Sequence, residues 1–259
     1  MSRLAVLTFL VSVVACTADI PDTEYAQINP QDVQSGYMFL TADTQALQDD
    51  AFANPGFLWV DRGETLFNSN LSDQPACQSC HTNGLAGVAA RYPRVDDQTG
   101  RLLNLEGRIN QCRTDHQSAP PLVYESDDLL ALTAYVARQS RGMPIEVGTG
   151  ANVQDYLAIG KDYFTTRRGQ FNLSCQQCHT ENWGAQLRGD TISQGHGNGF
   201  PAYRLEWQSL GSLQRRLRDC DTGVRAEPLP YGSETYLAVE LYLASRAQGL
   251  ALESPAVRR

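Results

Sequence analysis

Two short cysteine–histidine motifs constrain this chain more than any other feature of its sequence. One is Cys77-Gln-Ser-Cys80-His81 and the other is Cys175-Gln-Gln-Cys178-His179. The pattern C-x-x-C-H is the attachment signature of c-type haem, because its two cysteines can bond the two vinyl groups of one porphyrin. The histidine that follows then reaches the iron from one face. Zinc and dithiol sites also use C-x-x-C but do not need this histidine. The two copies therefore predict two covalently bound haem c groups.

The first residues are typical of a targeting signal. A short cationic start, Met1-Ser-Arg3, precedes the mainly apolar segment Leu4–Ala15, which is too short to span a membrane. Small residues follow at Ala15, Cys16 and Ala18. This pattern predicts a signal peptide over residues 1–18 and export to the periplasm. The alternative is a lipoprotein whose lipidated residue is Cys16. No later segment is long and apolar enough for a transmembrane helix.

Composition narrows the class of protein further. The chain has 259 residues, of which 42% are hydrophobic, and it carries a net charge of −8. That hydrophobic content is enough for a buried core and excludes a disordered protein. The acidic balance gives no reason to expect a nucleic-acid partner.

The two haem motifs belong to a repeated unit. The segments Trp59–Phe67 and Tyr156–Phe164 each precede one motif and place a glycine four residues before phenylalanine. Each unit ends with a predicted helix, Tyr124–Ala137 in the first and Tyr231–Ala244 in the second, capped by Ser126 and Ser233. We therefore predict an all-α fold with two tandem cytochrome c-like domains related by internal duplication.

The repeat also predicts the domain boundaries. After the signal peptide we expect an N-terminal extension over residues 19–50, one cytochrome c-like domain over 51–150 and a second over 151–259. The second domain would carry the active site. The glycine-containing segment Pro144–Asn152 is the predicted linker.

Few residues can bind the second face of each iron. After His179 the sequence contains no methionine, so the second haem cannot take one from its own unit. Instead, both units contain Arg-x-x-x-Cys, as Arg108–Cys112 and Arg216–Cys220. Cys112 and Cys220 follow their motifs at the distance expected of a distal ligand. A thiolate ligand would lower the reduction potential of the iron.

Two alternatives remain for these positions. Cys112 and Cys220 could form a disulfide between the units, which requires a close pseudo-twofold axis. His196 could be a distal ligand instead, but it has no counterpart in the first unit. Its glycine-rich surroundings, Ser193–Gly199, are more typical of a mobile surface loop.

The arginine of each pair has a predicted role of its own. On a helix, Arg216 lies one turn from Cys220, where its guanidinium favours a thiolate and attracts an anion. Binding of a haem propionate is an alternative role for Arg216, and the two are compatible. Arg108 sits in a less basic stretch, where a propionate contact is the simpler interpretation.

With these motifs the chain resembles the SoxA family, the dihaem cytochrome c subunits of bacterial SoxAX complexes of thiosulfate oxidation. The resemblance covers nearly all of the predicted mature chain, and Arg216-x-x-x-Cys220 is its most specific feature. It implies ligation of the first haem by His81 and Cys112, and of the second by His179 and Cys220. It also implies that Cys220 is a catalytic persulfide and that Arg216 binds the substrate.

The activity implied by the resemblance is that of an L-cysteine S-thiosulfotransferase. Such an enzyme oxidatively conjugates thiosulfate to a cysteine-bound sulfur on a carrier protein and passes two electrons to cytochrome c. The implied partners are a monohaem SoxX-like subunit, forming a heterodimer, and a SoxYZ-like carrier. The alternative is a dihaem electron-transfer cytochrome without bond-forming chemistry.

Overall fold

The computed structural model describes residues 28–70 and 74–259 of the chain. The predicted signal peptide, residues 1–18 with Cys16, lies outside this part, so the prediction stands untested. Within the described residues, no helix is both long and apolar enough to cross a bilayer.

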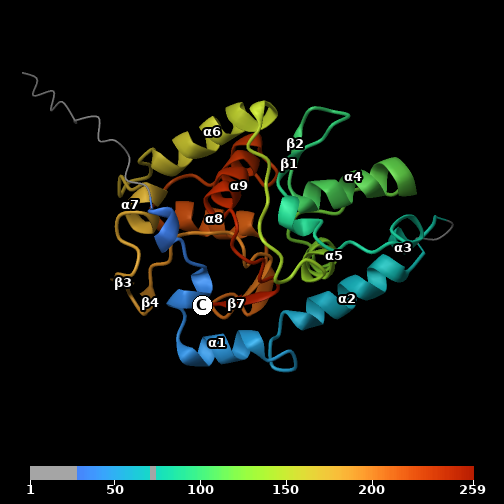
Figure 1. Ribbon diagram of the computed structural model, residues 1–259, viewed down its shortest axis with the longest axis horizontal. Helices are drawn as coiled ribbons and strands as arrows, with labels where there is room; N and C mark the ends of the chain where they lie inside the picture. The colour runs from blue at the N-terminus through green and yellow to red at the C-terminus, as the bar shows by residue number, and fades with distance from the viewer. Residues whose placement is uncertain (1–27, 71–73) are drawn as a thin grey trace, which may run out of the picture.

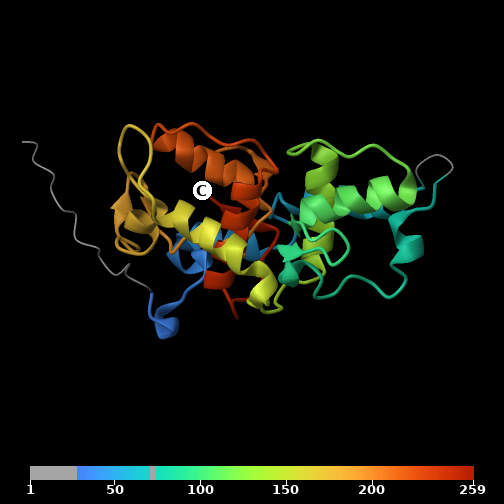
Figure 2. The same ribbon diagram turned by 90° about the horizontal axis from the view of Figure 1, so that it is seen from above.

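Two helix pairs form the framework of the molecule (Figure 1). In the N-terminal half, α2 (Phe57–Asn68) packs against α5 (Asp127–Arg138). In the C-terminal half, α6 (Gln154–Thr165) packs against α9 (Glu234–Arg246). Helices α2 and α6 contain the two segments predicted before the motifs, and α5 and α9 contain the predicted closing segments apart from their first three residues. Figure 2 shows the two halves side by side, with the N-terminal half in cyan and green and the other in yellow to red.

A glycine permits each of these helix crossings. A Cβ atom on Gly63 of α2 would lie 2.0 Å from the carbonyl oxygen of Ala131 on α5. A Cβ atom on Gly160 of α6 would lie 2.2 Å from the carbonyl oxygen of Ala238 on α9. Both distances are far below any possible contact, so the two backbones can meet only where one residue lacks a side chain.

Serine caps begin the two closing helices as the sequence predicts. The Ser126 hydroxyl accepts a hydrogen bond from the Leu129 amide, and the Ser233 hydroxyl accepts one from the Tyr236 amide. Each bond satisfies a backbone donor that the first helical turn leaves unpaired.

The remaining helices of the described chain are shorter or lie beside the haem motifs. They are α1 (Ala42–Asp49), α3 (Cys77–Cys80), α4 (Leu105–Gln117), α7 (Cys175–His179) and α8 (Leu213–Gly223), with 3-10 turns η1 (Pro30–Asp32), η2 (Gly36–Phe39), η3 (Ala89–Arg91) and η4 (Ala151–Val153).

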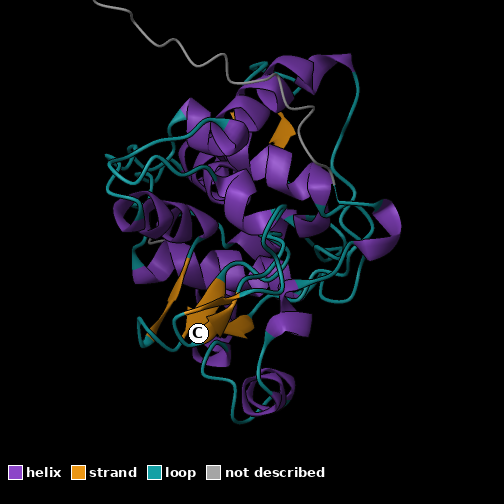
Figure 3. Cartoon of the chain, turned by 90° about the vertical axis from the view of Figure 1, so that its left-hand side faces the viewer, coloured by secondary structure: helices purple, strands orange, loops and turns teal. Residues whose placement is uncertain are grey.

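Helices dominate the fold, as predicted, but the structure also contains short strands (Figure 3). The hairpin of β5 (Ala202–Arg204) and β6 (Ser209–Gly211) is antiparallel, and β7 (Ala256–Arg258) joins β5 in parallel. Two further hairpins pair β1 (Arg94–Val95) with β2 (Leu102–Leu103) and β3 (Gln186–Leu187) with β4 (Asp190–Thr191). The expectation of a purely α fold was therefore too simple, because strands of two or three residues are too short to leave an alternating pattern.

The described part of the N-terminal extension packs against the C-terminal half. Helix α1 contacts β7, and the Gln48 side chain accepts a hydrogen bond of 3.1 Å from the Val257 amide. Further along, the Gln34 amide donates to the side chain of Gln194 at 2.8 Å. In Figure 2 this blue segment lies among the elements of the C-terminal half.

The largest hydrophobic cluster of the described residues joins the two halves. It contains Phe67 and Leu132 from the first half together with Leu237 and Leu241 from the second. The segment predicted as the linker joins this core through Ile145, which is 4% exposed. The Ile145 amide also donates to the carbonyl oxygen of Leu250 at 2.9 Å. The connection between α5 and α6 is therefore packed structure rather than a free tether.

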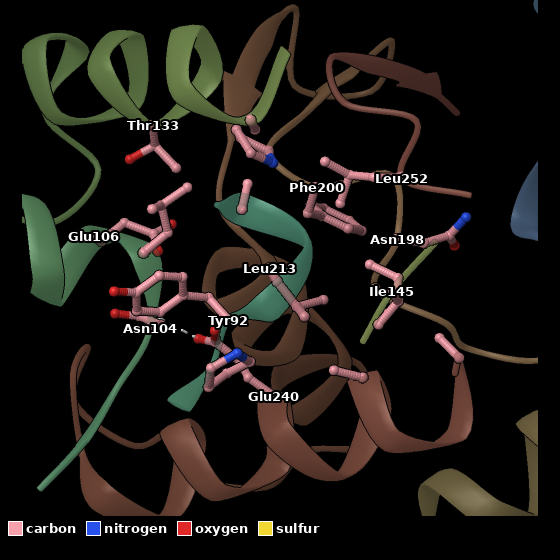
Figure 4. A pocket seen from close by; sticks show the side chains of 18 residues that line it. Tyr92, Asn104, Glu106, Thr133, Ile145, Asn198, Phe200, Leu213, Glu240 and Leu252 are labelled. Atoms are coloured by element: carbon pink, nitrogen blue, oxygen red, sulfur yellow. Dashed lines mark hydrogen bonds between the residues drawn. The ribbon is translucent and has the colours of Figure 1, made fainter. Parts of the chain in front are cut away.

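A small cavity lined by two acidic side chains lies between the halves (Figure 4). Its volume is about 80 Å³, and Glu106 of α4 and Glu240 of α9 both border it. Asn104 donates to Glu240 at 3.2 Å and accepts from the Tyr124 hydroxyl at 3.1 Å. Burial raises the pKa of both carboxyl groups. The charge of Glu106 raises the pKa of Glu240 further, because two buried anions repel each other.

Candidate haem-binding and active site

The first C-x-x-C-H motif forms the short helix α3 and its C-terminal cap. Cys77 and Cys80 lie at its two ends, and His81 caps it. The Phe67 ring of α2 lies 6.1 Å from the His81 ring, centroid to centroid. Cys112 lies on α4, where burial raises the pKa of its thiol and the nearby Cys77 and Cys80 raise it further. The fold thus brings the lone cysteine of the first unit to its haem motif.

The second motif has the same arrangement. Cys175 and Cys178 lie on α7, whose N-terminus is fixed by a capping box between Ser174 and Gln177. Burial raises the pKa of the Cys175 thiol to about 12, and the next largest cause is the nearby Cys220 of α8. Burial raises the pKa of the Cys178 thiol, and the nearby Cys220 raises it further. The lone cysteine of the second unit therefore also lies near its own motif.

The backbone orients the His179 ring. Its Nδ1 atom lies 2.8 Å from the carbonyl oxygen of Ser193, a distance at which Nδ1–H donates and Nε2 is left as the free acceptor. A carbonyl in this position is the usual partner of a metal-ligating histidine. Burial lowers the pKa of His179 to about 4, which keeps the imidazole neutral. Gly195 packs so closely on this ring that its Cβ atom would lie 2.8 Å from Cγ.

The glycine-rich segment is not the exposed loop that the sequence suggested. His196 is 8% exposed, and its neighbours Gln194 and Asn198 are 0% and 2% exposed. Gln194 is held on both sides by the N-terminal extension, through the Gln34 amide and the Asp32 carbonyl. The prediction failed because glycine content signals turns but does not tell whether another segment covers them.

This packing also argues against His196 as a distal ligand. The segment contacts the Nδ1 side of His179, which is the side that faces away from a metal held at Nε2. A second ligand to an iron held by His179 would therefore come from another segment. The His196 Nε2 atom is instead 3.2 Å from the side-chain oxygen of Gln194.

The proposed disulfide alternative is not formed. Cys112 and Cys220 are both free thiols in the structure, on α4 and α8 respectively. Each lies near the haem motif of its own half.

The two Arg-x-x-x-Cys pairs differ in what the arginine contacts. The Arg108 guanidinium pairs with the buried Asp96 carboxylate at 2.5 Å and donates to the Tyr92 hydroxyl at 3.0 Å. Arg216 has no ion pair with any residue that the structure describes. Arg108 is thus held by protein groups, whereas Arg216 is available to an incoming anion.

One arginine near this site was missed by the sequence analysis. Arg204, on β5, is 7% exposed, and its buried Nε atom has no hydrogen-bond acceptor among the described residues. Burial lowers the pKa of its guanidinium, and the charge of Arg216 lowers it further. No spacing in the sequence relates Arg204 to Cys220, because the hairpin that carries it was not predicted.

The residues around both motifs fit a covalently bound haem. Each motif offers two free cysteines, a histidine and a facing thiol. On the second, the Nε2 atom of a neutral histidine is left as the free acceptor. Nearby, the buried Nε atom of Arg246 also lacks a partner in the described chain, and such a donor suits a propionate. The chemistry of this donor set matches no other common prosthetic group.

The fold and these motifs define a c-type cytochrome. A family model described as "SoxA/TsdA, cytochrome c domain" matches the chain twice, over residues 62–145 and 159–252. The chain belongs to this SoxA/TsdA cytochrome c family, as its resemblance to SoxA predicted, and it therefore carries covalently bound haem c.

Several named relatives are similar in sequence to this chain over most of their length. The protein named L-cysteine S-thiosulfotransferase subunit SoxA from Pseudaminobacter salicylatoxidans is 37% identical over 87% of this chain and 80% of its own. The protein of the same name from Rhodovulum sulfidophilum is 38% identical over 88% and 80%. The crystal structure of SoxXA from P. pantotrophus matches with a TM-score of 0.83 and 37% identity, covering 88% of this chain and 87% of that chain.

Proposed function

We propose that this chain is the haem-carrying subunit of an L-cysteine S-thiosulfotransferase. It would conjugate thiosulfate to a cysteine-bound sulfur on a carrier protein and pass two electrons to cytochrome c. The relatives that share 37–38% of its sequence are named for this activity. The observation that carries the proposal is the unpaired Arg216 on the same helix as Cys220, beside the second haem motif.

The reaction balances as an oxidation. In its net form, a carrier thiol and thiosulfate give a new S–S bond, one proton and two electrons. No bond within thiosulfate breaks. When bound, the haems supply the one-electron redox chemistry through which those two electrons leave.

Cys220 and Arg216 would have separate roles in this reaction. Cys220 would carry sulfur as a persulfide and hold it beside the second motif. Arg216 would bind the sulfonate end of thiosulfate, because a guanidinium donates to two oxygens of one anion at once. One helical turn separates the two residues on α8, so both side chains lie on the same face of the helix.

We assign two haems to the chain, one to each motif. The first would be attached through Cys77 and Cys80 and ligated by His81 and Cys112. The second would be attached through Cys175 and Cys178 and ligated by His179 and Cys220. The proximity of each lone cysteine to its motif supports these assignments.

An internal duplication explains the architecture and supports domains at 51–150 and 151–259. Gly63 and Gly160 make matching close contacts, with Ala131 and Ala238. The rings of the matching tyrosines Tyr124 and Tyr231 lie nearly parallel across the halves, with centroids 6.1 Å apart and an interplanar angle of 10°. Corresponding residues meet in this way near a pseudo-twofold axis.

The partners and location follow from the same assignment. The solved relative is titled SoxXA, which supports a heterodimer with a monohaem SoxX-like cytochrome. The activity requires thiosulfate, a SoxYZ-like carrier and a cytochrome c acceptor. Covalent haem attachment and the predicted signal peptide support a periplasmic protein.

Reduction of cytochrome c by thiosulfate tests the proposal when the carrier and the heterodimer are both present. The wild-type chain should support it, and Cys220→Ser should abolish it while both haems stay attached. Cys112→Ser is the matched control and should retain more activity, because it alters an electron site and leaves the bond-forming residue. If Cys220→Ser conjugates thiosulfate nearly as well as wild type, the chain is an electron carrier instead.

A further inference from the structure

The β5–β6 hairpin packs a buried cation close to α8, the helix that carries Arg216 and Cys220. Arg204 ends β5, and its side chain is 8% exposed. A buried guanidinium is expensive unless its donors find acceptors. The Nη2 atom of Arg204 donates to Glu206 at 3.0 Å, but its buried Nε atom has no acceptor among the described residues. The Nε donor of Arg204 is therefore left unsatisfied by the described protein groups.

The side chain of Glu206 does not neutralise this cation within the protein. It is 66% exposed, so the ion pair is screened by solvent. Hydrogen bonding to Arg204 lowers the pKa of Glu206, and the charges of Arg216 and Arg188 also lower it. One exposed carboxylate thus lies within electrostatic range of three arginines, so it does not balance their positive charge.

A tryptophan fixes the position of Arg204. The guanidinium of Arg204 lies 4.9 Å from the centroid of the Trp207 ring, and the guanidinium of Arg215 lies 4.3 Å from the same ring. The indole Nε1–H donates to the carboxylate of Asp219 at 2.7 Å. Because Asp219 immediately precedes Cys220 on α8, this bond ties the hairpin to the helix next to the proposed sulfur carrier.

Arg204 and Arg216 are near enough for their charges to interact. Burial lowers the pKa of Arg204, and the charge of Arg216 acts in the same direction, as two neighbouring cations must. The charge of Cys220, by contrast, raises the pKa of Arg204. Two guanidiniums held near one sulfur match the chemistry of thiosulfate, whose three sulfonate oxygens accept hydrogen bonds and whose outer sulfur is free to face Cys220.

We infer that Arg204 is a second binding residue for the sulfonate group of thiosulfate, acting beside Arg216; this inference rests on the proposed function. The alternative ligand is a haem propionate, whose carboxylate oxygens also accept hydrogen bonds from a guanidinium. The two sources differ in a measurable way, because a propionate contact affects the haem itself whereas a sulfonate contact affects the affinity for free thiosulfate.

Calorimetric titration of the haem-loaded heterodimer with thiosulfate, in the absence of the carrier, tests the inference without turnover. Arg204→Gln should raise the dissociation constant of thiosulfate by about ten- to a hundredfold, the effect of losing one charge-assisted contact. Arg204→Lys should recover part of the affinity, because it keeps the charge but not the fork of donors. Arg215→Gln is the matched control, since it removes the other cation from the same Trp207 ring, and it should leave the affinity unchanged.

Three results would overturn the inference. Unchanged affinity in Arg204→Gln with a shifted potential of one haem would assign Arg204 to a propionate. Unchanged affinity with unchanged haems would remove any role in binding. Equal weakening in Arg204→Gln and Arg215→Gln would show that only the stack on Trp207 matters. Arg216→Gln, titrated in parallel, distinguishes failure of the Arg204 inference from failure of the proposed function. If Arg216→Gln also leaves the affinity for thiosulfate unchanged, there is no anion site beside Cys220.

Discussion

Gly160 lies so close to Ala238 that a Cβ atom on the glycine would stand 2.2 Å from the alanine carbonyl oxygen. The next nearest atom is Cβ of Tyr242, at 2.7 Å. Backbone atoms of a packed helix cannot move aside as a flexible side chain can. The crossing of α6 and α9, which positions α7 and its haem motif, therefore depends on the absence of one side chain.

Gly160→Ala should accordingly destabilise the protein. Overpacking a rigid contact costs about 1–3 kcal/mol, and two backbones in direct contact place this variant at the upper end. The free energy of unfolding in urea, measured on the haem-loaded chain, gives the value. Gly148→Ala is the control, because a Cβ atom there meets nothing within 4 Å and should leave stability nearly unchanged. Equal stability of the two variants would contradict the close crossing.

The buried acids of the central cavity predict a pH dependence of stability. Burial raises the pKa of Glu106 and Glu240 above their ordinary value of 4.5. The folded state therefore keeps protons that the unfolded chain releases as pH rises. The free energy of unfolding should fall as pH increases above about 4.5, by about 1.4 kcal/mol for each unit of pKa difference.

Glu240→Gln should remove much of the decrease in unfolding free energy with rising pH, because an amide does not titrate between pH 4.5 and neutrality. Unfolding measured at several pH values compares it with Glu64→Gln, an exposed position on α2 that should keep the wild-type slope. Parallel pH profiles for all three proteins would contradict the raised pKa values of the cavity acids.

Ligation of the two irons predicts a spectroscopic asymmetry between cysteine variants. Both ferric haems should be low-spin with thiolate character in electron paramagnetic resonance, since each motif has a facing cysteine. Cys112→Met should change one of the two signals, and Cys220→Met should change the other. A variant that alters neither signal, or both, would show that these cysteines are not separate distal ligands.

Haem content should follow the two motifs independently. The pyridine haemochrome assay should give two haems per chain for the wild-type protein. Replacing Cys77 and Cys80 together by serine should leave one, because the second motif has its own helix and cap. One haem in the wild-type chain would mean that one motif is not used.

The sequence predicted the parts of the fold that leave local signals. The family and the helix-rich cytochrome c fold are confirmed. They could be predicted because C-x-x-C-H is a specific signature of haem c attachment. The helices that begin after Ser126 and Ser233 were predicted because a capping serine and an apolar repeat coincide there.

The parts that the sequence did not predict depend on distant contacts. The hairpin that carries Arg204 is stabilised by β7 at the far end of the chain, so no local pattern marks it. The glycine-rich segment looked exposed, yet it is covered by the N-terminal extension through Gln34 and Gln194. Tertiary packing decides such positions, and the spacing of residues in one chain does not record it.

Mass spectrometry of the peptide that contains Cys220 tests the central claim most directly. The protein is purified without reductant, exposed to thiosulfate and carrier, alkylated and digested, and the peptide mass is compared with that of the Cys112 peptide. We expect the mass of an additional sulfur atom on Cys220, removable by thiol reductant, and none on Cys112. A Cys220 peptide that never carries extra sulfur, in a preparation that actively conjugates thiosulfate, would contradict its role as the sulfur-carrying residue.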